Sequence, residues 1–278
     1  KVWEYVIDTN QSPEDFYNKG LKWKHPKLEY TPLNIIGENA RVSVRVPEGV
    51  DVIAADALYK DNGIVKKRAI PIRETEKKRQ YGLFFKPEAM GEHKVVITLS
   101  DGTEDFVVMN VMDRIETVIE ERVEYICSSL YNGENGRTPY AFEPISNQGE
   151  SLGKANLVLK KNLFGTPDVG QVRKVESCAV NYVRNKWFVD GNFRNPRKLY
   201  GDFYRCMDFE YISHLFYLLS EFGDEVLALH DAGTYLEWAA DVFELRVNPD
   251  LHQEERGKEE AQMLGVYFLY FNQLLDKL

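Results

Sequence analysis

The spacing of apolar residues divides the chain into a first part with the periodicity of strands and a second part with that of helices. From residue 41 to 46, valines alternate strictly with polar residues, which is typical of a half-buried strand. Turn residues separate this run from further candidate strands at 52–59, 64–72, 80–86, 93–99 and 104–111. Short strands at this spacing predict an antiparallel β-sandwich within residues 1–112.

A short helix is predicted ahead of these strands. Ser12 is followed by Pro13 and by the acidic residues Glu14 and Asp15. Serine is a favourable N-cap, proline is tolerated at the first helical position, and acidic side chains are favourable in the first turn.

The period changes after Met112, where apolar residues begin to recur every three or four positions from Ile115 to Ile126. Asp113 and Glu116 have the spacing of a capping box, so a helix is expected to begin there and run to about residue 131. Further helices are predicted at about 151–161, 168–186, 204–222, 225–245 and 256–277. Residues 113–278 are therefore expected to form a domain of antiparallel helical hairpins.

Composition narrows the possible functions. The formal net charge of −9 argues against a nucleic-acid-binding protein, and no apolar stretch is long enough to span a membrane. The three cysteines lack the spacing of a metal site and lie in partly apolar helical segments, so buried free thiols are expected, with a single disulfide as the alternative. No metal-ligand, P-loop or dinucleotide motif is present, so neither a metal nor a cofactor is expected, and Ca²⁺ held by loop carboxylates stays open as the alternative.

Several stretches together resemble a family of glycan-processing proteins. The similarity extends over about residues 85–250, and the stretches that carry it are Gly91-Glu92-His93, Phe106-Val107-Val108, residues 114–122, residues 149–155, Lys160-Lys161-Asn162 with Pro167, Tyr204-Arg205-Cys206-Met207-Asp208-Phe209, and Tyr235-Leu236 with Ala239. In this order they resemble the six-hairpin glycosidase-like superfamily, and within it a group of large bacterial proteins of unassigned function.

The resemblance implies an α/α toroid after the sandwich, a poly- or oligosaccharide as partner, and a secreted, periplasmic or cell-surface location. The predicted helices are few for a complete toroid and the last remains apolar up to Leu278, so the helical domain is expected to continue beyond this chain. Tyr211 departs from the family pattern, which has histidine at that position, and this puts the family's chemistry in doubt for this chain.

Three carboxylates are candidates for catalysis. Asp208 ranks first because it lies three positions after Arg205 on one face of a predicted helix, where an arginine can orient it. Glu150, before the second helix, and Asp202, in the loop leading to Arg205, are candidates for the second group that glycoside hydrolysis needs. Structural alternatives remain open, namely an Arg–Asp pair for Asp208 and a helix cap for Asp202.

Other side chains are candidates for holding a saccharide. Aromatic rings suit the C–H faces of sugars, and arginine can grip an acidic sugar through paired hydrogen bonds. His214 lies four positions after Glu210, a spacing that allows an acid/base unit or a surface pair. The candidate substrate-binding residues are Arg205, Tyr204, Tyr211, His214, Trp187, Arg194, Tyr200 and Tyr140.

Three functions are compatible with these residues. The first is a glycoside hydrolase that uses two carboxylates. The second is a polysaccharide lyase, in which Tyr211 or His214 acts as base while Arg205 and Asn192 neutralise a uronate. The third is a non-catalytic glycan-binding or scaffold portion of a larger enzyme. We predict a carbohydrate-active protein, with the hydrolase as the first hypothesis.

Overall fold

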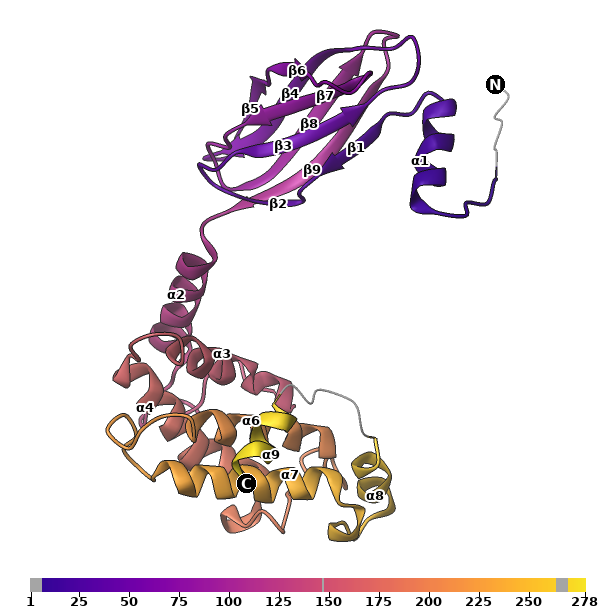
Figure 1. The fold of residues 1–278 in the computed structure, drawn as a ribbon. Helices are drawn as coiled ribbons and strands as arrows, with labels where there is room; N and C mark the ends of the chain where they lie inside the picture. Colours follow the sequence, from indigo (N-terminus) through magenta and orange to yellow (C-terminus); the bar gives the residue numbers. More distant parts are fainter. Residues whose placement is uncertain (1–6, 147, 264–269) are drawn as a thin grey trace. The chain divides into compact units, whose positions relative to one another are not determined.

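A computed structural model describes residues 7–146, 148–263 and 270–278. The chain divides into two compact units, Lys1–Val118 and Ile119–Leu278. The first unit holds the strands and the second holds most of the helices (Figure 1). The predicted order of a β-sandwich followed by a helical region is therefore confirmed.

The sandwich consists of two sheets. Every predicted run from residue 41 on contains a strand, the run 64–72 holds two, and β1 and β2 precede the predicted runs. One described sheet has the order β1-β3-β7-β6, and the other has the order β2-β9-β8-β4-β5. The strands are β1 (Lys27–Tyr30), β2 (Leu33–Ile35), β3 (Ala40–Arg45), β4 (Val52–Asp61), β5 (Ile64–Ala69), β6 (Ile72–Glu74), β7 (Gln80–Phe85), β8 (Gly91–Leu99) and β9 (Glu104–Met112).

The two sheets enclose an apolar core, to which alternate residues of each strand contribute. Val42 and Val44 of β3 pack with Leu83 of β7 from one sheet, and Val95 and Ile97 of β8 come from the other. All five side chains are fully buried. The pairing is not antiparallel throughout, because β2 pairs with β9 in parallel. Such a pair requires a long crossover between its strands, a nonlocal feature that alternation along one strand does not reveal.

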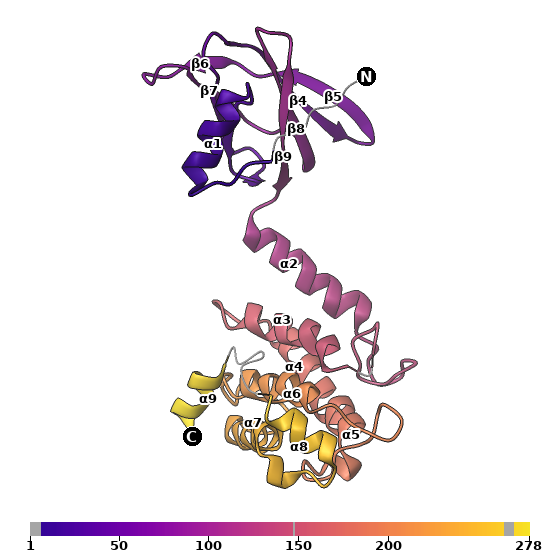
Figure 2. The same ribbon diagram turned by 90° about the vertical axis from the view of Figure 1, so that its right-hand side faces the viewer.

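The predicted N-terminal helix is also present, as α1 (Pro13–Lys22). Ser12 caps it, since the Ser12 side chain accepts a hydrogen bond of 3.1 Å from the backbone N–H of Asp15. Figure 2 shows α1 lying beside the sheets rather than between them, and none of its residues is buried.

The second unit is a set of packed helices with two π-helical turns. Its described helices are α2 (Ile115–Tyr125), η1 (Ile126–Leu130), η2 (Gly149–Leu152), α3 (Gly153–Asn162), α4 (Val169–Ser177), η3 (Cys178–Val183), α5 (Arg184–Trp187), η4 (Val189–Gly191), α6 (Cys206–Leu219), α7 (Ala232–Val247), η5 (Pro249–Leu251), α8 (Glu255–Ala261) and α9 (Phe271–Lys277). The α6 helix lies at the centre, and all but two of its residues are buried. All three cysteines are buried and free, as expected.

Two helix starts differ from the prediction. The side chain of Asp113 accepts a hydrogen bond from the backbone N–H of Arg114, one residue on, so the expected capping box does not form. The helix predicted from residue 225 begins only at Ala232, because the preceding backbone N–H groups bind a buried carboxylate instead of entering a helix. The predicted helix at 256–277 corresponds to α8 and α9, and residues 264–269 between them lie outside the described residues.

Candidate functional site

Asp208 lies near the start of α6 with only 1% of its surface exposed. One carboxylate oxygen accepts a hydrogen bond of 3.0 Å from the backbone N–H of Gly149. The other oxygen accepts bonds of 3.2 Å from the Trp187 indole and 2.7 Å from the Tyr200 hydroxyl. Burial raises the pKa of Asp208, and these donors oppose the rise. Both oxygens are thus already engaged.

The local sequence explains how the partners of Asp208 reach it. Gly149 opens η2, and a Cβ atom at this position would lie 2.8 Å from the backbone of Asp208, so only glycine permits the approach. Trp187 ends α5 and is 2% exposed, with its ring in the core. Tyr200 lies in the loop before α6, where its backbone N–H bonds the carbonyl of Phe203.

Arg205 links the buried Asp208 to the exposed surface. Its guanidinium lies 3.9 Å from Asp208 and 3.1 Å from Glu150, and the Arg205 side chain is 18% exposed. The Glu150 side chain is 38% exposed. The guanidinium therefore holds one inner carboxylate that is sequestered and one outer carboxylate that is in contact with solvent.

A second cation, Lys186, lies close to the Trp187 ring. Its Nζ donates to the carbonyl of Ser146 at 2.9 Å and to the Tyr182 hydroxyl at 2.8 Å, and it lies 4.7 Å from the centroid of the Trp187 ring. Burial lowers the pKa of Lys186, while the charge of Asp208 opposes this effect. We call Glu150, Lys186, Trp187, Tyr200, Arg205 and Asp208 the Arg205 cluster.

The Tyr200 ring of the Arg205 cluster stacks on a neighbouring aromatic ring. Tyr200 and Phe203 stack with centroids 5.5 Å apart, and the two rings are tilted by 19°. Arg205 lies 5.6 Å from the Tyr200 centroid, and Arg256 lies 3.6 Å from the Phe203 centroid. The half-buried rings and flanking guanidinium groups form a surface that combines apolar faces with hydrogen-bond donors.

The remaining loop candidates do not join the cluster through any described contact. Asp202 is exposed, and Tyr140 lies in the long loop before η2 with a positive φ of 64°. Arg194 pairs with Glu244 at 2.5 Å on the exposed surface. The structure thus brings together Asp208, Glu150, Arg205, Tyr200 and Trp187, and leaves Asp202, Arg194 and Tyr140 elsewhere.

Three candidates on or beside α6 face the core. The Tyr204 hydroxyl bonds Nδ1 of His252 at 2.9 Å, and Tyr211 packs partly buried against the core. His214 stacks on Tyr270 with ring centroids 4.5 Å apart, and burial lowers the pKa of His214 to about 4. Glu210 and His214 are both buried, so they are not the surface pair that their spacing allowed.

Sequence reasoning missed Gly149, Lys186 and Phe203. The only local signals were a glycine beside a candidate acid and a lysine next to a tryptophan, and neither is distinctive. The contact between Gly149 and Asp208 joins residues that lie 59 positions apart, and periodicity carries no information on such contacts.

Comparisons with known proteins indicate the fold. No protein-family model matches the chain, and no curated protein matches it. Among solved structures, the polysaccharide lyase BACCELL_00875 matches 96% of this chain with a TM-score of 0.67 and 16% sequence identity. This chain spans only 41% of the length of that lyase. The similarity shows that the two proteins share a fold over nearly the whole chain.

A further structural match is too distant to use. A superoxide reductase (neelaredoxin) from Ignicoccus hospitalis matches 36% of this chain and 93% of its own length, with a TM-score of only 0.25 and 11% identity.

The described part of the chain also bears on metal binding and membrane insertion. Within it, no group of three or more histidine, cysteine, aspartate or glutamate side chains lies close enough together to hold a metal ion. No helix in the same residues is both long and apolar enough to cross a membrane.

Proposed function

We propose that this chain is part of a carbohydrate-active protein of the polysaccharide-lyase type, and that the Arg205 cluster binds the acidic group of a uronate-containing saccharide. The observation that carries the proposal is the common fold with a polysaccharide lyase over 96% of this chain. A secreted or cell-surface location follows from the same proposal, since large polysaccharides are met outside the cell.

The chemistry of the Arg205 cluster supports this ligand class. A planar guanidinium binds a carboxylate through two parallel hydrogen bonds, and the Arg205 guanidinium already does so in part with the exposed Glu150 at 3.1 Å. Glu150 therefore occupies the position that we assign to the carboxylate of an incoming uronate. Neutralising that carboxylate is what a lyase needs, because it acidifies the neighbouring C–H bond.

The geometry favours this hypothesis over hydrolysis by Asp208. A hydrolase needs two carboxylates that both reach the glycosidic bond. Asp208 is 1% exposed, and both its oxygens accept hydrogen bonds from the protein. We assign it a positioning role, in which it holds Arg205, Tyr200 and the η2 turn in place.

The identity of the lyase base is a separate question from the binding of the uronate. Burial and the bond to Asp208 raise the pKa of Tyr200, so this hydroxyl remains protonated at neutral pH and is not the base in this arrangement. Tyr211 and His214 stay as the proposed base candidates, although both face the core and would have to become accessible.

The test is binding and turnover of acidic polysaccharides by the full chain. Alginate, polygalacturonate and hyaluronan serve as probes, with dextran as the neutral control. We expect retardation by at least one acidic probe in affinity electrophoresis. Arg205→Ala should lower the affinity for that probe about tenfold, because a charge-assisted hydrogen-bond pair is lost. Arg205→Lys, which keeps the charge but loses the planar fork, should have an intermediate effect.

Arg194→Ala is the matched control, because Arg194 is an exposed arginine paired with a glutamate outside the cluster. Product analysis separates the functions. Ultraviolet absorption from an unsaturated product supports a lyase, new reducing ends without that absorption indicate a hydrolase, and retention without product indicates a binding module. No retention by any acidic probe, or an equal loss in both arginine variants, would overturn the proposal.

A further inference from the structure

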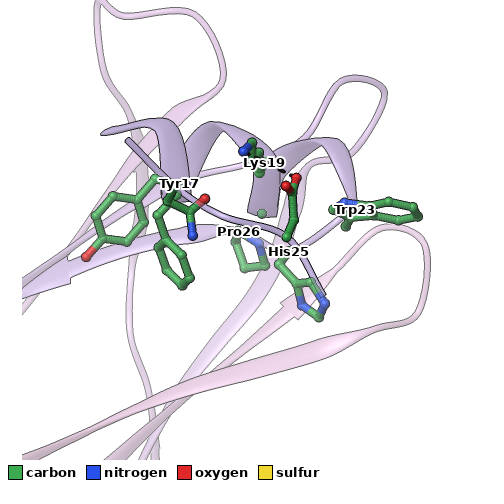
Figure 3. Close-up of a pocket in the computed structure, with 9 residues that line it drawn as sticks. Tyr17, Lys19, Trp23, His25 and Pro26 are labelled. Atoms are coloured by element: carbon green, nitrogen blue, oxygen red, sulfur yellow. Dashed lines mark ion pairs between the residues drawn. The ribbon is translucent and has the colours of Figure 1, made fainter. Parts of the chain in front are cut away.

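A pocket in the first unit, remote in sequence from the Arg205 cluster, lies against α1. It encloses about 540 Å³, within the range of about 300–1,000 Å³ that small-molecule sites occupy. Figure 3 shows Tyr17 and Trp23 at opposite ends of the pocket, with Pro26 and His25 between them. The full lining is Asp8, Asn10, Phe16, Tyr17, Lys19, Gly20, Trp23, His25 and Pro26.

The aromatic rings of this pocket do not serve a core. Trp23 is 57% exposed and Phe16 is 59% exposed, and α1 buries no residue. A helix of this length is marginal in water by itself, so it needs support from elsewhere. The described support includes charged side chains: Glu14 pairs with Lys27 at 3.1 Å and with Arg45 at 3.5 Å, and the Lys27 Nζ lies 4.6 Å from the centroid of the Tyr17 ring. The apolar side of α1 is therefore left facing the pocket.

The spacing along α1 forms the pocket. Phe16 and Gly20 lie four residues apart on one face of α1, and Trp23, the C-cap residue directly after the helix, follows three residues later. Gly20 has no side chain between the two rings. The atom nearest to a Cβ built at Gly20 would be the Cβ of His25, at 4.0 Å. The glycine thus keeps open a space that any larger side chain would fill.

The cationic side chain of the pocket lining, Lys19, is already paired with carboxylates. Lys19 pairs with Asp8 at 3.2 Å and with Asp15 at 3.3 Å, and its Nζ also donates to the carbonyl of Thr9 at 2.5 Å. The neutralised Lys19 ammonium does not favour an anionic ligand, whereas Asp8, Asn10 and His25 offer donors and acceptors for hydroxyl groups. Flat rings with polar groups around them match a neutral sugar, which presents C–H faces and a rim of hydroxyls.

We propose that this α1 pocket binds a neutral hexose unit of a saccharide chain, with Trp23 and Phe16 against the sugar faces. The choice of a saccharide rests on the proposed function. The site itself is separate, because it selects an uncharged unit and uses none of the residues of the Arg205 cluster.

The experiment measures binding of cellohexaose, mannohexaose and maltohexaose to the full chain by titration calorimetry. We expect saturable binding of at least one probe. Trp23→Ala should lower the affinity about tenfold, and Gly20→Leu should do the same by filling the pocket. Leucine favours helix more than glycine, so loss of binding in Gly20→Leu is not explained by loss of α1.

Phe106→Ala is the matched control, since Phe106 is 51% exposed on β9 and does not line the pocket. Absence of saturable binding to all three probes would overturn the proposal, as would wild-type affinity in both pocket variants. A dimer in gel filtration that Trp23→Ala dissociates would also overturn it, since a second copy would then be the occupant.

The two proposals fail separately. Loss of acidic-polysaccharide binding in Arg205→Ala, with no binding of neutral oligosaccharides, removes only the α1 pocket proposal. Binding of a neutral oligosaccharide that depends on Trp23, without retention by any acidic polysaccharide, contradicts only the proposal that the Arg205 cluster binds a uronate.

Discussion

Two buried carboxylates in the helical unit, Glu176 and Asp208, each link two segments of the chain through hydrogen bonds, but their surroundings differ. Glu176 is 0% exposed and accepts hydrogen bonds of 2.8 Å from the backbone N–H groups of Ala228 and Leu229 and from the Tyr235 hydroxyl. The backbone N–H of His230 adds a longer contact of 3.4 Å. This carboxylate ties the loop before α7 to α4.

Asp208 likewise ties the η2 turn to α6, but its partners include a cation. Arg205 lies 3.9 Å away and extends toward solvent, where it meets Glu150. The described partners of Glu176 are backbone groups and one buried tyrosine. A buried acid is therefore not by itself a sign of catalysis, and the partly exposed guanidinium beside Asp208 is what distinguishes a candidate site from an anchor.

The largest expected effect tests Glu176 as an anchor. Glu176→Ala should lower the free energy of unfolding by about 4 kcal/mol, because it leaves several buried N–H groups and a hydroxyl without an acceptor. Chemical denaturation measures the change. Glu237→Ala, an exposed glutamate on α7, is the control and should change stability by less than about 0.5 kcal/mol. Equal effects of the two substitutions would remove the anchor role.

A third buried carboxylate, Glu210, differs from both because neither of its oxygens has a hydrogen-bond partner among the described residues. Burial raises the pKa of Glu210 from 4.5 to about 7. The folded state then holds a proton that the unfolded state releases, so stability from this group is full below about pH 4.5 and is lost as pH rises toward 7.

The Glu210→Gln variant should therefore be more stable than the wild type at pH 8, by up to about 3 kcal/mol, and similar to it below pH 4.5. Denaturant titrations at several pH values measure the difference. His214, whose pKa is lowered to about 4, has the opposite pH dependence in both proteins and cancels in the comparison. A constant difference between the two proteins across this range would contradict the prediction.

The close approach of η2 to α6 is tested at Gly149. Gly149→Ala places a Cβ 2.8 Å from backbone atoms of Asp208, and we expect a loss of about 2 kcal/mol in unfolding free energy. Gly153→Ala, in the same segment and with no atom within 4 Å of its Cβ, is the matched control. That control should be neutral or stabilising by up to about 1 kcal/mol, because alanine favours helix. Thermal unfolding of the two variants compares them directly.

The smallest effect concerns the outer carboxylate of the Arg205 cluster. Glu150→Gln removes the charge that competes for Arg205, so affinity for an acidic polysaccharide should rise about two- to fivefold, in keeping with a half-exposed ion pair. Affinity electrophoresis at low salt detects the change. A loss of binding or of product formation would instead give Glu150 a direct role toward the substrate, as the hydrolase hypothesis requires.

Strands and helix starts that depend only on neighbouring residues could be predicted from the sequence alone. Alternation of valine with polar residues specifies β3, and Ser12 followed by Pro13 specifies the start of α1. The apolar surroundings of the three cysteines indicated that they are buried. In each case the residues that specify the element lie within a few positions of each other, so the pattern along the chain is enough to predict the element.

The tertiary structure decided the site, because its contacts join distant residues. Asp208 meets Gly149 across 59 positions and Trp187 across 21 positions, and only the packed helices bring these groups together. The same reason explains the late start of α7, since Glu176 binds the backbone N–H of Ala228 from 52 positions away. Periodicity reports which face of an element is buried, whereas the fate of each buried polar group depends on the partner that folding supplies.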